Sequence, residues 1–118
     1  MTTGWYCSKT FGSGSYTGRA EIAAFIEDVR RELVWTHHIL TNGDIHIDAD
    51  GLHARGRWYL QALEDVLLKD GQIAGYEVFA EYNDTFAKCN GKWCLLEVRP
   101  VVHVVRRVNS GWRIRNTD

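Results

Sequence analysis

The chain has 118 residues, of which 45% are hydrophobic and 25% are charged, and its formal net charge at pH 7 is −1. These values are close to the average for globular proteins, and a chain of this length can bury a core without disulfides or a metal. We therefore expect one domain that spans residues 1–118. Because the charge is nearly balanced, the composition predicts neither nucleic acid nor an anionic membrane as a partner.

Residue patterns argue against further classes. No stretch reaches the roughly 20 apolar residues of a membrane span, and the N-terminal residues lack the apolar run of a secretion signal, so we expect a cytoplasmic protein. The cysteines Cys7, Cys89 and Cys94 are odd in number and match no zinc spacing, which predicts reduced thiols. The glycines of "FGSGSYTG" match phosphate-binding motifs only loosely. We expect a loop there, and no cofactor.

In chain order, the first predicted regular element is an amphipathic helix that begins at Arg19 and ends near Leu33. Apolar residues recur at helical spacing, and charged residues occupy the other side. The apolar positions are Ile22, Phe25, Ile26, Val29 and Leu33.

The rest of the chain is predicted to form strands. Val34–Ile39 is followed by a turn at "TNGD", by "IHID", and by a second turn at "ADG". The long run "LHARGRWYLQALEDVLL" then reads as a strand, although Leu60, Leu63 and Leu67 keep a helical period, so a helix stays open at its end. After a turn at "KDGQ" come "YEVFAEYNDTFAKC", "CLLEVRPVVHVVRRV" and a short terminal strand "WRIRN". This order predicts an α+β fold with one helix against a twisted antiparallel sheet.

Asn90-Gly91 lies between two alternating runs, which is the strongest local signal for a β-hairpin. A two-residue turn pairs Cys89 with Lys92, and the same register places Asp84 opposite Glu97 and Tyr82 opposite Arg99 on one face. Carboxylates that face each other raise the pKa of one of them, which provides an acid and a base in one place. The alternative is a solvated outer face, where such charges cost little.

The motif "THH" places His37 and His38 side by side in a strand. Adjacent strand residues point to opposite faces, so the two imidazoles cannot bind one metal. The remaining histidines and "DADG" lack the spacing of zinc or calcium sites, and we predict no metal. A single inward histidine is a candidate general acid or base, and a hydrogen-bonded structural histidine is the alternative.

The runs "GSYTGRAEIAAFIEDVRRELVWTHHILTN", "IHIDADGLHARGRWYLQAL" and "YNDTFAKCNGKWCLLEVRP" resemble the SnoaL-like polyketide cyclase and scytalone dehydratase branch of the nuclear transport factor 2-like superfamily. The resemblance implies a cone-shaped α+β barrel, in which a curved, mainly antiparallel sheet encloses a pocket. It places His38 inward, with Ala80 and Tyr82 along the pocket. The family helices that cap the cone before Arg19 have no counterpart.

The same resemblance implies a protein that binds a small, largely apolar, cyclic or aromatic molecule in the cone. One reading is general acid/base chemistry of the lyase, isomerase or hydrolase kind, in which His38, Asp84 and Glu97 move protons and Trp58, Tyr82 and Arg99 hold the ligand. The other reading is a non-catalytic ligand-binding or dimerisation module. We also expect a homodimer through the sheet, because a cone with one helix leaves apolar sheet surface exposed.

Overall fold

The computed structural model describes residues 4–7, 14–108 and 111–112, and for residues 4–7 and 14 it describes the backbone alone. The elements in chain order are β1 (Gly4–Cys7), β2 (Gly14–Thr17), α1 (Gly18–Glu32), β3 (Leu33–Ile47), β4 (His53–Leu67), β5 (Ile73–Cys89), β6 (Lys92–Val98) and β7 (Pro100–Val108).

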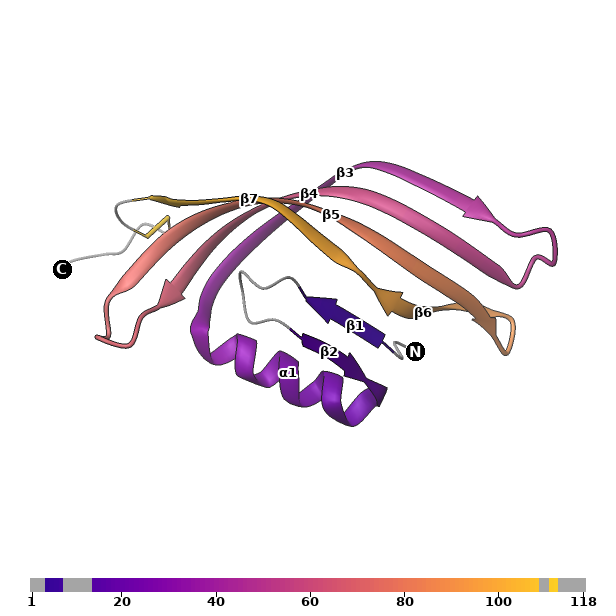
Figure 1. Cartoon of the computed structure of the whole chain (residues 1–118), viewed down its shortest axis with the longest axis horizontal. Coiled ribbons are helices and arrows are strands. Elements are labelled where there is room, and N and C mark those ends of the chain that lie inside the picture. The colour runs from indigo at the N-terminus through magenta and orange to yellow at the C-terminus, as the bar shows by residue number, and fades with distance from the viewer. Residues whose placement is uncertain (1–3, 8–13, 109–110, 113–118) are drawn as a thin grey trace.

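The strands form one arched sheet in the order β2-β1-β6-β5-β4-β3, and β7 pairs with β5 next to the segment that pairs with β6. All the described pairings are antiparallel except that of β1 with β6. Figure 1 shows the helix and the β1–β2 hairpin beneath the concave side of the arch, while the β3–β4 and β5–β6 hairpins project beyond them. This arrangement confirms the predicted α+β fold with one helix and a curved, mainly antiparallel sheet.

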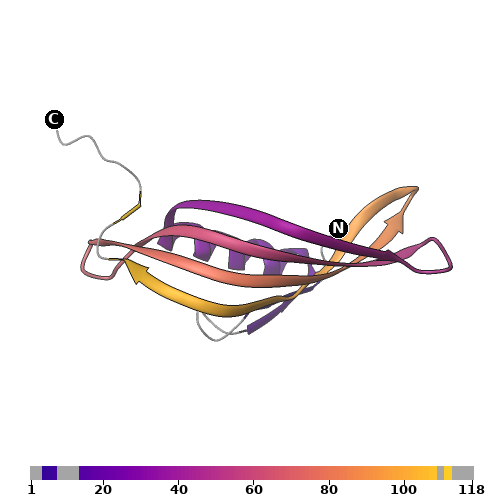
Figure 2. The ribbon, with the colours of Figure 1, turned by 90° about the horizontal axis from the view of Figure 1, so that it is seen from above.

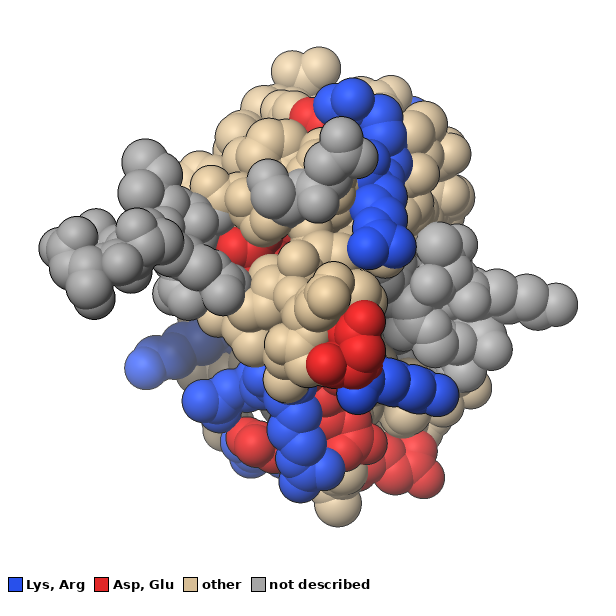
Figure 3. Space-filling view, turned by 90° about the vertical axis from the view of Figure 1, so that its left-hand side faces the viewer, with Lys and Arg blue, Asp and Glu red and all other residues tan. Residues whose placement is uncertain are grey.

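Helix α1 is attached to the sheet through its apolar side and its two ends. Ile22 is buried, and the ring of Phe25 stacks on that of Tyr16 in β2 with 4.2 Å between centroids. The helix then runs directly into β3 and lies across the underside of the sheet (Figure 2). Arg30 and Arg31 pair with acidic residues three positions earlier, and positive and negative side chains alternate over the lower part of the view in Figure 3.

The core lies on the concave side of the central strands. It consists of Leu60 and Ala62 of β4 and Val78 and Ala80 of β5, with Tyr82, Val102 and Val105 packed against it. The intervening residues of β4, such as Arg55, Arg57 and Tyr59, are exposed on the outer, convex side. One face of the central sheet is therefore apolar, and the other is in contact with solvent.

Two local predictions were wrong, because each missed an extra strand pairing. The "TNGD" turn is a bulge between Thr41 and Asp44 inside one continuous strand, in which Asn42 takes a φ of 54°. The N-terminal segment is not only a loop, since β1 pairs with β2. At the end of the "LQALEDVLL" run, where the sequence allows a strand or a helix, the structure has a strand, because it pairs with β5 as far as Leu67 opposite Ile73.

The hairpin at Asn90-Gly91 is confirmed, since both residues have positive φ, 52° and 78°, and Cys89 pairs with Lys92. Positive φ at both central residues is the signature of the type I′ turn, which Asn-Gly favours. The predicted terminal strand "WRIRN" lies outside the described residues except for Trp112.

Trp112 connects the C-terminal segment to a buried carboxylate. Its backbone N–H donates to Asp65 Oδ1 at 2.7 Å, and its indole N–H donates to the carbonyl oxygen of Tyr76 at 2.9 Å. Asp65 is fully buried. A buried carboxylate of this kind depends on its donors, because water cannot replace them.

We expect Asp65→Ala to lower the free energy of unfolding by about 1.5–3 kcal/mol, the usual contribution of a hydrogen bond to a charged group. Urea denaturation followed by circular dichroism measures this change. Asp48→Ala, at an exposed aspartate, is the matched control and should shift stability by less than about 0.5 kcal/mol. Equal effects of the two substitutions would contradict the conclusion that the hydrogen-bonded Asp65 carboxylate stabilises the fold.

Candidate functional site

The concave face carries one histidine at its open edge. His38 of β3 lies opposite Ala62 of β4, so both side chains are on the concave side. Its Nε2 lies 3.8 Å from Oε1 of Glu64, the next concave residue along β4. The His38 side chain is 41% exposed, whereas that of Glu64 is 10% exposed. An accessible imidazole thus stands beside a buried carboxylate and next to the apolar core, which is an arrangement that can exchange protons with a ligand.

His37 lies on the opposite side of the sheet. It is paired with Leu63, and its ring stacks against Trp35 with centroids 6.3 Å apart. The prediction that the two neighbouring histidines diverge is therefore confirmed by the register. His38 is the one that reaches the concave side.

Aromatic residues occupy the far half of the concave face. Trp58 lies opposite Tyr82, and its ring meets Phe86 edge-to-face at 6.0 Å and 73°. The indole lies over Gly56, where a Cβ atom would come within 2.2 Å of the ring. Gly56 is therefore required for this position of Trp58, because any side chain would displace the ring. Two of the predicted ligand-holding residues, Trp58 and Tyr82, thus share this face with His38.

Glu97 and Arg99 do not lie where the hairpin register predicted. Pairing follows the two-residue turn as far as Phe86 opposite Leu95, but a bulge then inserts one residue, and Glu97 pairs with Thr85 instead of Asp84. A shift of one residue transfers every later side chain to the other face. The predicted pairing of Asp84 with Glu97 is therefore wrong, as is the placement of Tyr82 and Arg99 on one face.

Beyond the bulge, Glu97 and Arg99 pair with each other, with Arg99 Nε donating to Glu97 Oε2 at 3.2 Å. The backbone of Arg99 also bonds to β5, where its carbonyl oxygen accepts the N–H of Asn83 at 2.9 Å. Arg99 lines a shallow hollow of about 380 Å³ that is formed mostly by polar and charged residues. Its lining is formed by Asp44, His46, Arg55, Gly56, Arg57, Asn83, Asp84, Thr85 and Arg99.

Asp84 is half-buried beside this bulge and in register with Gly56. Burial raises the pKa of the Asp84 carboxyl, and the backbone N–H of Arg99, 3.4 Å from Oδ1, opposes that rise. The predicted elevation of a pKa here thus holds for Asp84, but its physical cause is loss of water and not a second carboxylate.

Glu64 is the residue that sequence reasoning missed. It follows Leu60 and Ala62 on the concave side, so strict alternation along β4 would have identified it. Leu60, Leu63 and Leu67 also fit a helical period, and this second pattern concealed the alternation. Among the described residues, Glu64 and Asp65 are the buried charged side chains.

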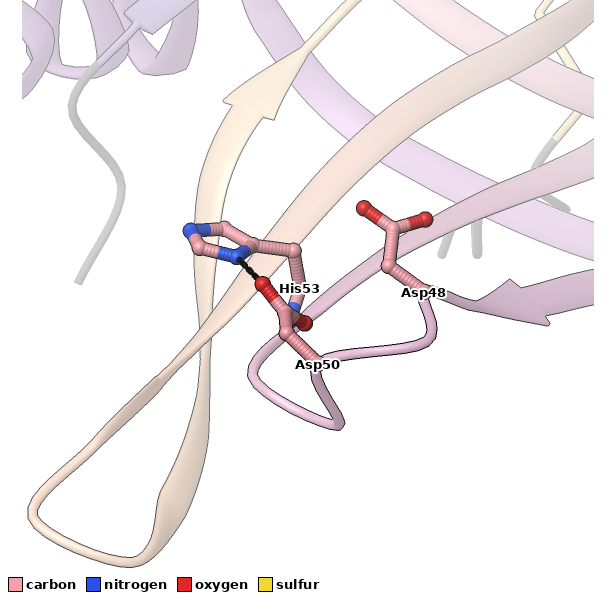
Figure 4. A group of neighbouring side chains, drawn as sticks. All are labelled: Asp48, Asp50 and His53. Atoms are coloured by element: carbon pink, nitrogen blue, oxygen red, sulfur yellow. Dashed lines mark hydrogen bonds and ion pairs between the residues drawn. The ribbon is translucent and has the colours of Figure 1, made fainter.

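The turn between β3 and β4 brings together three groups that could hold a cation. Ligand atoms of Asp48, Asp50 and His53 lie within 4.8 Å of one another, and all three side chains are exposed (Figure 4). Both carboxylate oxygens of Asp50 already have partners. Oδ1 accepts the Leu52 N–H at 2.8 Å, and Oδ2 lies 2.8 Å from His53 Nδ1. These bonds lower the pKa of Asp50, and the bond from the Leu52 N–H has the largest effect. They form the turn, and an exposed acidic turn of this kind is not by itself a metal site.

Substitution at Asp84 should change how stability depends on pH. Because the folded-state pKa is raised, the stability that Asp84 contributes is present below the unfolded pKa of about 4 and is lost as pH rises through the folded pKa. We therefore expect Asp84→Asn to raise the melting temperature at pH 7, with a smaller gain at pH 3.5. Thermal unfolding across this range measures the difference.

Glu97→Gln is the matched control, because Glu97 lies on the other side of the sheet. The Asp84 pKa, followed by carbon NMR, should not change in this variant. A fall in that pKa would restore the interpretation of Asp84 and Glu97 as a facing pair.

The SnoaL-like domain family model matches residues 3–99. Among solved structures, a type 2 hexachlorocyclohexane dehydrochlorinase, LinA, superposes with a TM-score of 0.79 at 16% identity, covering 98% of this chain and 73% of its own. LinA type 3 from Novosphingobium barchaimii LL02 gives 0.78 at 14% identity, with 98% and 75% covered. A proposed scytalone dehydratase from Novosphingobium aromaticivorans DSM 12444 gives 0.70 at 18% identity, with 96% and 74% covered. These likenesses show a shared fold.

A curated protein of Tuber melanosporum, the signal peptidase complex catalytic subunit SEC11, is 46% identical over 46 residues. That match covers 38% of this chain and 23% of the relative, so the chain spans about a quarter of the length of that protein. Among the described residues, no helix has the length and hydropathy needed to span a membrane. The family match covers most of the chain, and the chain belongs to the SnoaL-like domain family.

Proposed function

We propose that this protein binds a small, largely apolar, cyclic or aromatic molecule against the concave face of its sheet, and that His38 transfers a proton to or from it. The observation that carries the proposal is the position of His38, which combines an accessible imidazole with an apolar surface and a buried carboxylate neighbour. A general acid or base must lie within hydrogen-bond reach of the ligand, whatever its pKa.

The size of the apolar surface supports a ligand of one or two rings. Trp58 and Ala62 are separated by four residues along β4, which corresponds to about 13 Å at the rise of a β-strand. His38 lies opposite Ala62 at one end, and Trp58 and Tyr82 lie at the other. In this proposal Trp58 and Tyr82 hold the far edge of the ligand, and Asp84 lies beyond them. Glu97 and Arg99 have no place in it, because the bulge directs them to the other face.

The solved structures of similar fold support the reaction class. Their names, dehydrochlorinase and dehydratase, denote elimination reactions, which require removal of a proton from carbon. A lyase or isomerase reaction that begins with proton abstraction by His38 is consistent with the fold and with the site. The non-catalytic alternative retains the same bound ligand without that step.

We expect the protein to accelerate α-deuterium exchange of 2-tetralone in D₂O, a test of proton abstraction next to a carbonyl group. His38→Gln should reduce the enzyme-dependent rate by about 100-fold or more, in the range of general base catalysis. His37→Gln, at the neighbouring outward histidine, is the matched control and should retain the rate. Proton NMR of the ketone measures the exchange.

Equal rates in the two variants would remove His38 from the mechanism. Binding is tested separately by mapping NMR shifts as 2-tetralone is added. Shifts at Leu60, Ala62 and Val78 without exchange would favour the non-catalytic alternative.

The outer face of the sheet favours a second role, association of two copies. Exposed apolar residues from four neighbouring strands lie together there and include Ile39, Tyr59, Phe79, Val101 and Val104. Arg57 pairs with Glu81 and Arg106 with Glu77, both at 2.7 Å, so this surface presents both signs of charge. A surface with mixed charges around apolar residues can face its own copy across a two-fold axis.

We expect a homodimer that dissociates in Ile39→Arg, because a charge would then be buried in the apolar interface without a partner. Leu40→Arg is the matched control, since Leu40 is the next residue, is exposed and points to the concave side. Size-exclusion chromatography with light scattering at micromolar concentration gives the mass of each variant. A monomeric unmodified protein, or loss of the dimer in Leu40→Arg alone, would contradict this interface.

A further inference from the structure

Glu64 differs from the other buried carboxylate because one of its oxygens has no hydrogen-bond donor among the described residues. Asp65 accepts the backbone N–H of Trp112, whereas Glu64 Oε2 is buried and has no hydrogen-bond partner among the described residues. Its other oxygen lies 3.8 Å from His38 Nε2, which is beyond hydrogen-bond distance. No hydrogen bond joins Oε2 to its register neighbours Thr36 and Tyr76.

Such an oxygen is costly to maintain. A buried acceptor without a donor loses its hydration and gains nothing in return, and the loss is larger for a charged group. Each unsatisfied buried group in a natural structure calls for an explanation, and a role in function is one of them. Here the group lies on the concave face, one pleat beyond Ala62 and in contact with the accessible His38.

The chemistry of Glu64 restricts what can satisfy it. An ionised carboxylate accepts hydrogen bonds and donates none, so the complementary group must carry an O–H or N–H. A carboxylate or phosphate on the ligand would be repelled at this distance. On one side of Glu64 the concave face continues into the apolar core of Leu60, Ala62, Val78 and Ala80, which favours a neutral ring over a compact cation.

We infer that Glu64 is the anchoring acceptor for a hydroxyl group on the ligand, and that the ligands of this protein are neutral hydroxylated rings such as phenols and cyclic alcohols. This inference rests on the proposed function, because it places the ring on the same concave face. Rings that lack a donor, including halogenated and alkoxylated ones, leave Oε2 unpaired and bind more weakly. Glu64 thereby selects the ligand, and His38 beside it reacts with the molecule that Glu64 holds.

The test compares 2-naphthol with 2-methoxynaphthalene. The second probe keeps both rings and the oxygen atom, but the oxygen is a methyl ether and carries no O–H. Loss of a hydrogen bond to a charged group corresponds to a factor of about 10 to 150 in affinity. We therefore expect the unmodified protein to bind 2-naphthol at least about 10-fold more tightly. Glu64→Met should bind the two probes with affinities within about 3-fold of each other, because it removes the acceptor and retains side-chain volume.

Stability and a second variant separate this role from a structural one. Glu64→Met should leave the melting temperature unchanged or raise it, since it removes an unsatisfied buried oxygen. Glu81→Gln, on the outer face, should retain the preference for 2-naphthol. Equal affinities of both probes for the unmodified protein, with NMR shifts on the concave face, would overturn the inference and leave the proposed function standing.

Other outcomes are equally decisive. A preference that survives in Glu64→Met would assign the selection to another residue and overturn the inference. Marked destabilisation of Glu64→Met would mean that the carboxylate holds the fold and not the ligand. Absence of concave-face shifts with either probe would overturn both the inference and the proposed function.

Discussion

The uninterrupted antiparallel pairing of β4 with β5, from His53 opposite Ala87 to Leu67 opposite Ile73, is the constraint on which the rest of the structure depends. Because side chains alternate along both strands, this single register decides which residues face the helix and which face solvent. It assembles the core from Leu60, Ala62, Val78 and Ala80. It also leaves Glu64 on the apolar side.

Bulges on the neighbouring strands adjust this frame. One bulge, between Thr41 and Asp44, keeps β3 paired with β4 along most of its length while resetting its faces. Another, next to Thr85 and Phe86, places Glu97 and Arg99 on the outer side, whereas Tyr82 stays on the inner side through its pairing with Trp58. Each bulge adds a residue to one strand only, so the sheet bends there. In the bulged strand, the alternation of side chains between the two faces is inverted beyond the bulge.

The two sides of the sheet consequently have different chemistry. Among the described residues, the concave side has apolar and aromatic walls with one histidine and one buried carboxylate. The outer side has ion pairs between arginines and glutamates, interrupted by exposed apolar residues. The proposed ligand binding and the proposed self-association therefore need not compete for surface, because the two proposals use opposite faces of the same strands.

The sequence by itself determined the helix, the hairpin at Asn90-Gly91 and the divergence of His37 and His38, because each depends on local periodicity or on the φ preference of a turn. Through the family resemblance it also placed Trp58, Tyr82 and His38 on the inner side of a curved sheet. Only the tertiary structure decided the strand faces beyond the bulge and the proximity of Glu64 to His38. A bulge has no obligatory residue pattern, and a one-residue shift inverts every later position. Likewise, the contact of Glu64 with His38 joins two strands whose relative register depends on all the pairings between them.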